Sequence, residues 1–261
     1  DGFASLRLSH VYDFGREPNL QLETDLVLYG VEQATQDQLD TQLAQLTIGP
    51  RIDVDPDVAL GLELKPYARF EYIALGDRKY LSSYGAGLQA KYPWADAITL
   101  SANGSVTNRQ YNNTPRAPSA SNFDGLRSRL SLGLARELGN RTQADAFIGV
   151  LRENTKTGGS TNWEYHVSAS LRHAIPSPIS VLPGSWVFSL SLSGDFARYD
   201  APDPSVDSSI TRRDDKWRLN ALASIPLANN VALITSAGYA DIQSNLANYT
   251  YDNWRVSLGV V

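Results

Sequence analysis

The sequence has 261 residues, a formal net charge of −5, no cysteine and no methionine. The absence of cysteine excludes disulfide scaffolds, cysteine zinc sites and thiol nucleophiles. There is no run of about 18 apolar residues that would predict a membrane-spanning helix. A pI near 5.2 argues against a nucleic-acid partner, since such proteins carry a concentrated basic patch.

Apolar and polar residues alternate along almost the whole chain, which is the period of a β-strand because successive side chains point to opposite sides of a sheet. In one stretch Leu62 and Leu64 fall on one side, and Glu63 and Lys65 fall on the other. If the apolar side faces lipid, Leu64→Arg impairs assembly strongly and Glu63→Arg only mildly. No helical period extends over ten residues, so the sequence predicts an all-β protein. We expect about 13 strands, at 3–14, 19–31, 39–54, 60–74, 80–92, 98–111, 126–137, 142–152, 163–174, 185–198, 215–226, 231–242 and 249–261.

The expected strands are long. Many have 11 to 15 residues, whereas strands of soluble proteins usually have about five or six. A tilted strand needs about 9–11 residues to cross a bilayer. The strand lengths therefore favour a membrane barrel.

The connections between the strands alternate in length, as in outer-membrane barrels, which have short periplasmic turns and longer outer loops. Short connections fall at 15–18, 55–59, 93–97, 138–141 and 227–230. Longer ones fall at 32–38, 112–125, 153–162 and 200–214. Three depart from the alternation, at 75–79, 175–184 and 243–247.

Tryptophan and tyrosine gather near the ends of the expected strands, where they form girdles at the two interfaces of a barrel with the membrane. We expect this girdle to contain Tyr72, Tyr80, Tyr92, Trp94, Trp163, Trp186, Trp217 and Trp254. Together with the strand lengths and the loops, it predicts a transmembrane antiparallel up-and-down β-barrel. Such a barrel lies in the bacterial outer membrane, with lipids against its outer surface.

The directions of the terminal strands bear on the strand number. The first and last expected strands both run towards the periplasm, which requires an odd number, whereas single-chain bacterial barrels normally have an even one. We therefore expect 14 strands, with one before residue 1; the alternative is 12, if two short segments are loops. We treat 1–261 as a single barrel domain of a longer chain with an N-terminal periplasmic region.

We assign the more polar face of each strand to the inside of the barrel. Strand 39–54 has no clearly polar face and stays unassigned. Two interpretations remain open: a hydrated lumen with a slight preference for anions, or ladders of salt bridges that brace and block a narrow lumen. The charged residues on the inner faces are ten cations and seven anions, namely Arg7, Glu23, Asp25, Glu63, Lys65, Arg69, Glu71, Lys91, Arg109, Arg127, Arg129, Asp145, Glu164, Arg172, Asp195, Arg218 and Arg255.

The sequence does not predict an enzyme. A hydrolase of this membrane needs a histidine near a nucleophilic serine, oriented by a third polar group. Of the three histidines, His10 and His173 fall on apolar faces. His166 falls inside, two residues from Ser168, a pairing that arises easily by chance on a serine-rich strand. There is no Gly-x-Ser-x-Gly elbow, His-Glu-x-x-His motif or phosphate-binding glycine loop, and we expect no metal ion and no cofactor.

Three motifs in the C-terminal third resemble those of a known family. Arg212-Arg213-Asp214-Asp215 opens one expected strand, Ser244-Asn245 closes the next, and Tyr249-Thr250-Tyr251-Asp252-Asn253 begins the last. This series is similar to the C-terminal barrel of surface lipoprotein assembly modifiers and of related outer-membrane barrels that follow tetratricopeptide or other periplasmic domains. The resemblance covers about 70 residues and implies a 14-strand barrel with a role in export. The chain lacks the tetratricopeptide helices of that family.

Three functions follow as expectations. The leading one is a translocation or export pore for protein or other cargo, working with a periplasmic domain or partner. The closest alternative is a passive diffusion porin with mild anion preference, which an inward-folded loop at 112–125 would favour. The third is a sealed structural anchor in an outer-membrane complex, which a lumen filled with paired charges would favour. The sequence leaves the oligomeric state open.

Overall fold

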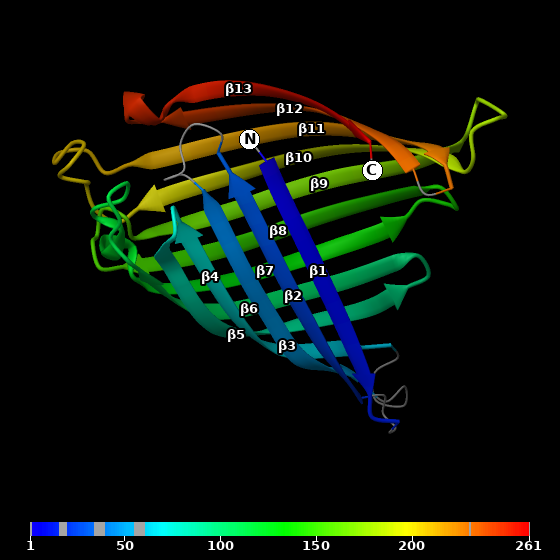
Figure 1. Cartoon of the computed structure of the whole chain (residues 1–261), viewed down its shortest axis with the longest axis horizontal. Helices are drawn as coiled ribbons and strands as arrows, with labels where there is room; N and C mark the ends of the chain where they lie inside the picture. Colours follow the sequence, from blue (N-terminus) through cyan, green and yellow to red (C-terminus); the bar gives the residue numbers. More distant parts are fainter. Residues whose placement is uncertain (1, 16–19, 34–39, 55–60, 230, 261) are drawn as a thin grey trace.

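The computed structural model describes residues 2–15, 20–33, 40–54, 61–229 and 231–260. Its strands form one antiparallel sheet in which each strand pairs with the next along the chain (Figure 1). The all-β, up-and-down arrangement is therefore confirmed. In the described connections lie the 3-10 turns η2 (Ala120–Phe123) and η3 (Ala247–Tyr249). The strands are β1 (Gly2–Asp13), β2 (Leu20–Glu32), β3 (Thr41–Asp53), β4 (Glu63–Leu75), β5 (Arg78–Ala95), β6 (Ile98–Tyr111), β7 (Gly125–Glu137), β8 (Thr142–Thr155), β9 (Asn162–Pro176), β10 (Ser185–Tyr199), β11 (Arg213–Ala228), β12 (Val231–Ser244) and β13 (Tyr251–Val260).

The connections define two ends of the sheet. We call the end with the β6–β7, β8–β9 and β10–β11 connections the loop side, and the opposite end the turn side; the loops gather at the left of Figure 1. One loop-side connection is only Gly76-Asp77, whose φ angles of 52° and 61° suit the type I′ turn of a tight hairpin. The expected connections at 15–18, 32–38, 55–59 and 227–230 lie wholly or partly outside the described residues.

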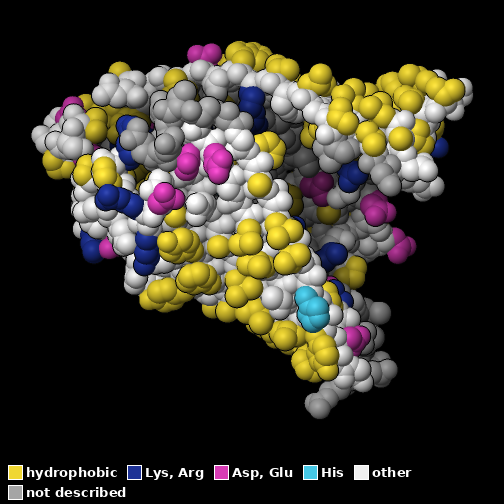
Figure 2. All heavy atoms as spheres, in the orientation of Figure 1, with side chains coloured by type: hydrophobic (Ala, Val, Ile, Leu, Met, Phe, Trp, Pro, Cys, Tyr) yellow, Lys and Arg dark blue, Asp and Glu magenta, His cyan; other side chains and the backbone are white. Residues whose placement is uncertain are grey.

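One face of the sheet exposes a continuous apolar surface. Leu8 is 54% exposed, Leu130 52% and Leu190 50%. Figure 2 shows apolar side chains forming a broad patch over the N-terminal strands. An apolar surface of this extent suits contact with lipid, because exposing it to water costs free energy. We call this the outer face.

The opposite, polar face is concave. Lys65 of β4 contacts Glu23 of β2, and Arg109 of β6 contacts Glu153 of β8, each pair reaching over an intervening strand. Side chains two strands apart converge on the inside of a curved sheet. A hollow of about 370 Å³ opens on this face between β7 and β10. We call it the inner face.

The sheet is open between its first and last strands. Among the described residues, β1 pairs only with β2 and β13 only with β12, and both edge strands are exposed along their length. With 13 strands the two edges run in the same direction, so the expected fourteenth strand would fit between them antiparallel to both; it stays a prediction. No helix in the described part of the chain is long and apolar enough to cross a membrane.

Candidate functional site

The turn side of the inner face carries an ion-pair network around Glu23. Arg51 Nη1 lies 3.0 Å from Glu23 Oε1, and Lys65 contacts the other carboxylate oxygen. Arg51 Nε is also 3.9 Å from the carboxylates of Asp53 and Glu63. We call these five residues the Glu23 cluster. Arg51 was missed from the sequence because the faces of its strand could not be distinguished; the pairing of β3 with β2 places it on the inner face.

A second network lies on the loop side. Arg109 of β6 and Arg127 of β7 both contact the carboxylate of Glu153 on β8, Arg127 at 3.0 Å. We call these three residues the Glu153 cluster; two cations against one anion give it a net positive charge. Glu153 was missed because the expected strand ended at 152, whereas β8 continues to Thr155.

Other charges on the inner face are paired in part. Arg7 Nη2 lies 3.3 Å from Asp25, and Arg69 Nη2 lies 2.7 Å from Glu71. These pairs are open to solvent, where each contributes only about 0–1 kcal/mol to stability. Arg218 contacts Asp195. Within the described residues, no ion pair joins Lys91, Arg129, Asp145, Glu164, Arg172 or Arg255.

The loop between β6 and β7, residues 112–124, is packed against the sheet. Its Ala117 and Ala120 contact Leu81 of β5 and Tyr111 of β6. Ala120 is 1% exposed and Leu81 is 2% exposed. Buried apolar contacts of this kind hold a loop in one position.

The contacts of this loop lie on the inner face. Tyr111 is two residues along β6 from Arg109, so both side chains point to the same side. The Phe123 ring meets the Tyr111 ring edge-on at 6.0 Å, and Asp124 accepts a hydrogen bond from the Tyr111 backbone. Lys156 Nζ holds the same carboxylate at 2.6 Å. The loop therefore covers part of the inner face at its loop side, next to the Glu153 cluster.

The expected girdle aromatics fall at both ends of the sheet. Tyr72, Trp163 and Trp217 lie on the outer face near the loop side, and Tyr92 and Trp186 on that face near the turn side. Trp94 is 60% exposed at the turn side. Trp254 packs on Tyr239, with ring centroids 4.5 Å apart. Tyr80 differs, because its ring packs edge-on against Tyr111 at 5.4 Å in the cluster beneath the loop.

The motifs of the C-terminal third meet in one structure on the loop side, which we call the rim clasp. Arg212 Nε donates to Asp214 Oδ1 at 2.9 Å, and its Nη2 lies 2.7 Å from Oδ2. The guanidinium also lies over the rings of Tyr249 at 3.4 Å and Tyr199 at 4.9 Å. Asn245 accepts from the backbone N–H of Arg213 at 2.8 Å.

A further pair ties β8 to the loop after β10. Arg152 Nη1 donates to Asp200 Oδ1 at 2.8 Å, and the Arg152 guanidinium lies over the Trp163 ring at 5.2 Å. The hydrogen bond from Arg152 holds the pKa of the Asp200 carboxyl below its usual value. The loop side is thus held by polar contacts outside the apolar band.

No protein-family profile and no curated protein matches the sequence. Among solved structures, the chain is similar to a loop-deletion variant of OmpT, an outer membrane protein of Vibrio cholerae, at 9% identity and a TM-score of 0.51, covering 99% of this chain and 98% of that one. It also matches BamA of Haemophilus ducreyi lacking POTRA domains 1–3, at 13% identity and a TM-score of 0.47, covering 99% of this chain and 63% of that one. The first likeness and the exposed apolar band agree: the fold is that of a β-barrel of the bacterial outer membrane.

Proposed function

We propose that the protein is a diffusion channel for small solutes, narrowed at its loop side by residues 112–124 and mildly selective for anions. The observation that carries the proposal is the packing of Ala117 and Ala120 onto the inner-face residues Leu81 and Tyr111. A loop that lies across the inner face narrows the path through a barrel without the need for a separate plug. Membrane lipids surround the outer face.

The charge beside this loop supports the anion preference. Arg109, Arg127 and Glu153 contribute two positive charges and one negative charge where the path is narrow. Arg129, which forms no ion pair with another described residue, lies two residues from Arg127 on the same face of β7. A ring of fixed charge at a constriction selects ions of the opposite sign.

Single-channel recording in planar bilayers tests the proposal. We expect steady openings with a reversal potential that shows anions to be more permeant in a salt gradient. Arg127→Gln removes one positive charge and shifts the selectivity towards cations, whereas Glu153→Gln shifts it towards anions. Arg136→Gln, on the opposite face of the same strand, is the matched control and leaves the selectivity unchanged. Replacing residues 115–121 with a short glycine-serine linker raises the conductance by roughly twofold.

The channel proposal is contradicted if the folded protein gives no openings in the bilayer. It is also contradicted if neither Arg127→Gln nor Glu153→Gln changes the ion selectivity. Export of cargo, which the resemblance to the surface lipoprotein assembly modifier barrels implied, stays a prediction. So does the sealed anchor. The ion pairs of the Glu23 and Glu153 clusters suit an anchor as well as a channel. The six charged inner-face residues that form no ion pair among the described residues favour a hydrated lumen, and hence the channel.

A further inference from the structure

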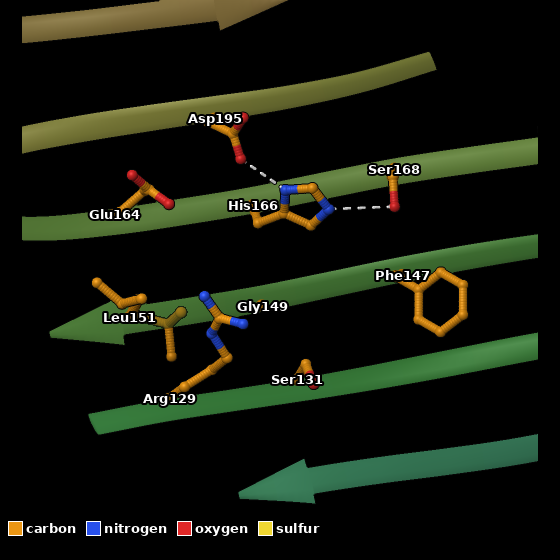
Figure 3. A pocket seen from close by; sticks show the side chains of 10 residues that line it. Arg129, Ser131, Phe147, Gly149, Leu151, Glu164, His166, Ser168 and Asp195 are labelled. Carbon is orange, nitrogen blue, oxygen red and sulfur yellow. Dashed lines mark hydrogen bonds and ion pairs between the residues drawn. The ribbon is translucent and has the colours of Figure 1, made fainter. Parts of the chain in front are cut away.

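Three polar side chains of the inner face form a connected chain beside the hollow between β7 and β10. His166 Nδ1 lies 2.6 Å from Asp195 Oδ1, and His166 Nε2 lies 3.2 Å from Ser168 Oγ (Figure 3). With the Nδ1 proton donated to the carboxylate, Nε2 is left as the acceptor for the serine hydroxyl. The order is that of a nucleophilic serine, its base and the group that orients the base.

The strand geometry explains why these residues meet. His166 and Ser168 are two residues apart on β9, so both side chains point inward. The pairing of β9 with β10 sets Asp195 directly opposite His166. Arg218 on β11 contacts the other oxygen of Asp195 and so fixes the carboxylate. Sequence reasoning missed this third group, because Asp195 is 29 residues from His166 along the chain.

The same three residues line the hollow, whose volume is about 370 Å³. Phe147 and Leu151 give it an apolar part, and Arg129 extends over it from β7 (Figure 3). A short acyl chain fits a space of this size and character. The guanidinium of Arg129 brings to the hollow the positive charge that suits a developing oxyanion.

We propose that Ser168 is a nucleophile that hydrolyses short-chain carboxylic esters entering the lumen. Ser168 Oγ attacks the carbonyl carbon while its proton passes to His166 Nε2. The bond from that carbon to the alcohol oxygen then breaks, and the leaving alcohol takes the proton from His166. Water attacks the resulting acyl-serine and gives a proton to His166; the acid leaves, and Ser168 recovers that proton. Asp195 orients the imidazole and stabilises its protonated form throughout.

A fluorophosphonate probe tests this in the full-length protein purified in detergent. We expect a single covalent adduct, mapped by peptide mass to Ser168, and hydrolysis of p-nitrophenyl butyrate by the same preparation. Ser168→Ala abolishes both, and Asp195→Asn slows both by a factor of about 100. Ser191→Ala is the matched control. Ser191 lies on the same face of β10 as Asp195 but outside the hollow, so this variant leaves the labelling and the hydrolysis unchanged.

Each variant is first shown to be folded by the shift in gel mobility between unheated and heated samples. Absence of an adduct in the folded protein, or an adduct that persists in Ser168→Ala, overturns the proposal. Equal labelling of wild type and Asp195→Asn also overturns it, because a bracing role for Asp195 leaves serine reactivity unchanged. Labelling and hydrolysis in detergent do not depend on whether the barrel conducts ions, so this test is separate from the bilayer recording.

Discussion

Replacing Leu130 with arginine lowers the free energy of unfolding by about 2–4 kcal/mol, the cost of a cation at the middle of the lipid-facing surface of a barrel. Leu130 lies near the centre of β7 (Gly125–Glu137), and its side chain is 52% exposed on the outer face. Its cross-strand neighbours are Gly104 and Val150, which offer no charge or hydrogen bond from their side chains. An arginine at this position has neither water to solvate its charge nor an acidic partner to neutralise it. Denaturant unfolding in phospholipid vesicles measures the loss.

Ser131→Arg is the matched control, one residue further along the same strand. Ser131 lies on the inner face and lines the hollow, so a longer polar side chain has space and water. We expect a change of about 0.5 kcal/mol or less. Equal losses for the two variants would show that the two faces of β7 have been assigned the wrong way round.

The alternation of residue types predicted the strands and their order because it reports directly on the two faces of a sheet. It did not report depth in the membrane. Leu64 falls on the correct face, but it is the second residue of β4, at the turn side. A long arginine side chain at that level reaches the interface, so the structure moves the most damaging site from Leu64 to Leu130.

Contacts between residues far apart along the chain could not be predicted from the sequence. The sequence predicted a loop at 112–125, but not that Ala120 packs inward onto Leu81. The pairing of Glu153 with Arg109, 44 residues away, depends on how far β8 continues and on the curvature of the sheet. The approach of Asp195 to His166 likewise depends on the register of β9 and β10. Periodicity gives the face of a residue, whereas its neighbours come from register and curvature.

The C-terminal motifs acquire a structural explanation. Asn245 accepts from the backbone of Arg213 and donates to the carbonyl of Thr211, which joins the start of β11 to the end of β12. Tyr249, the last residue of η3 just before β13, covers the Arg212 guanidinium. The spacing of the motifs therefore follows from the need to close the rim clasp, and such a clasp serves barrels of different functions equally well.

The clasp predicts a second large effect. Asp214 is fully buried, with 0% exposure, and Arg212 is its ion-pair partner. Arg212→Ala leaves this carboxylate buried without a compensating charge, and we expect a loss of about 3–5 kcal/mol in the free energy of unfolding. Arg212→Lys recovers only part of it, because an ammonium group cannot make the two-pronged contact or stack on the tyrosine rings. The same vesicle unfolding assay measures both.

The double variant Arg212→Ala/Asp214→Ala separates the lost ion pair from the lost packing. Removing the carboxylate as well removes the uncompensated charge, so the double variant should be more stable than Arg212→Ala alone, although it still lacks the contacts of the guanidinium with Tyr199 and Tyr249. If the stability losses of Arg212→Ala and Asp214→Ala simply add in the double variant, the clasp does not act by neutralising the buried charge. The stacking of Arg212 on the tyrosine rings then accounts for its whole contribution. A double variant whose stability lies between those of Arg212→Ala and the wild type shows instead that a buried ion pair holds the clasp, and that its two partners are needed together.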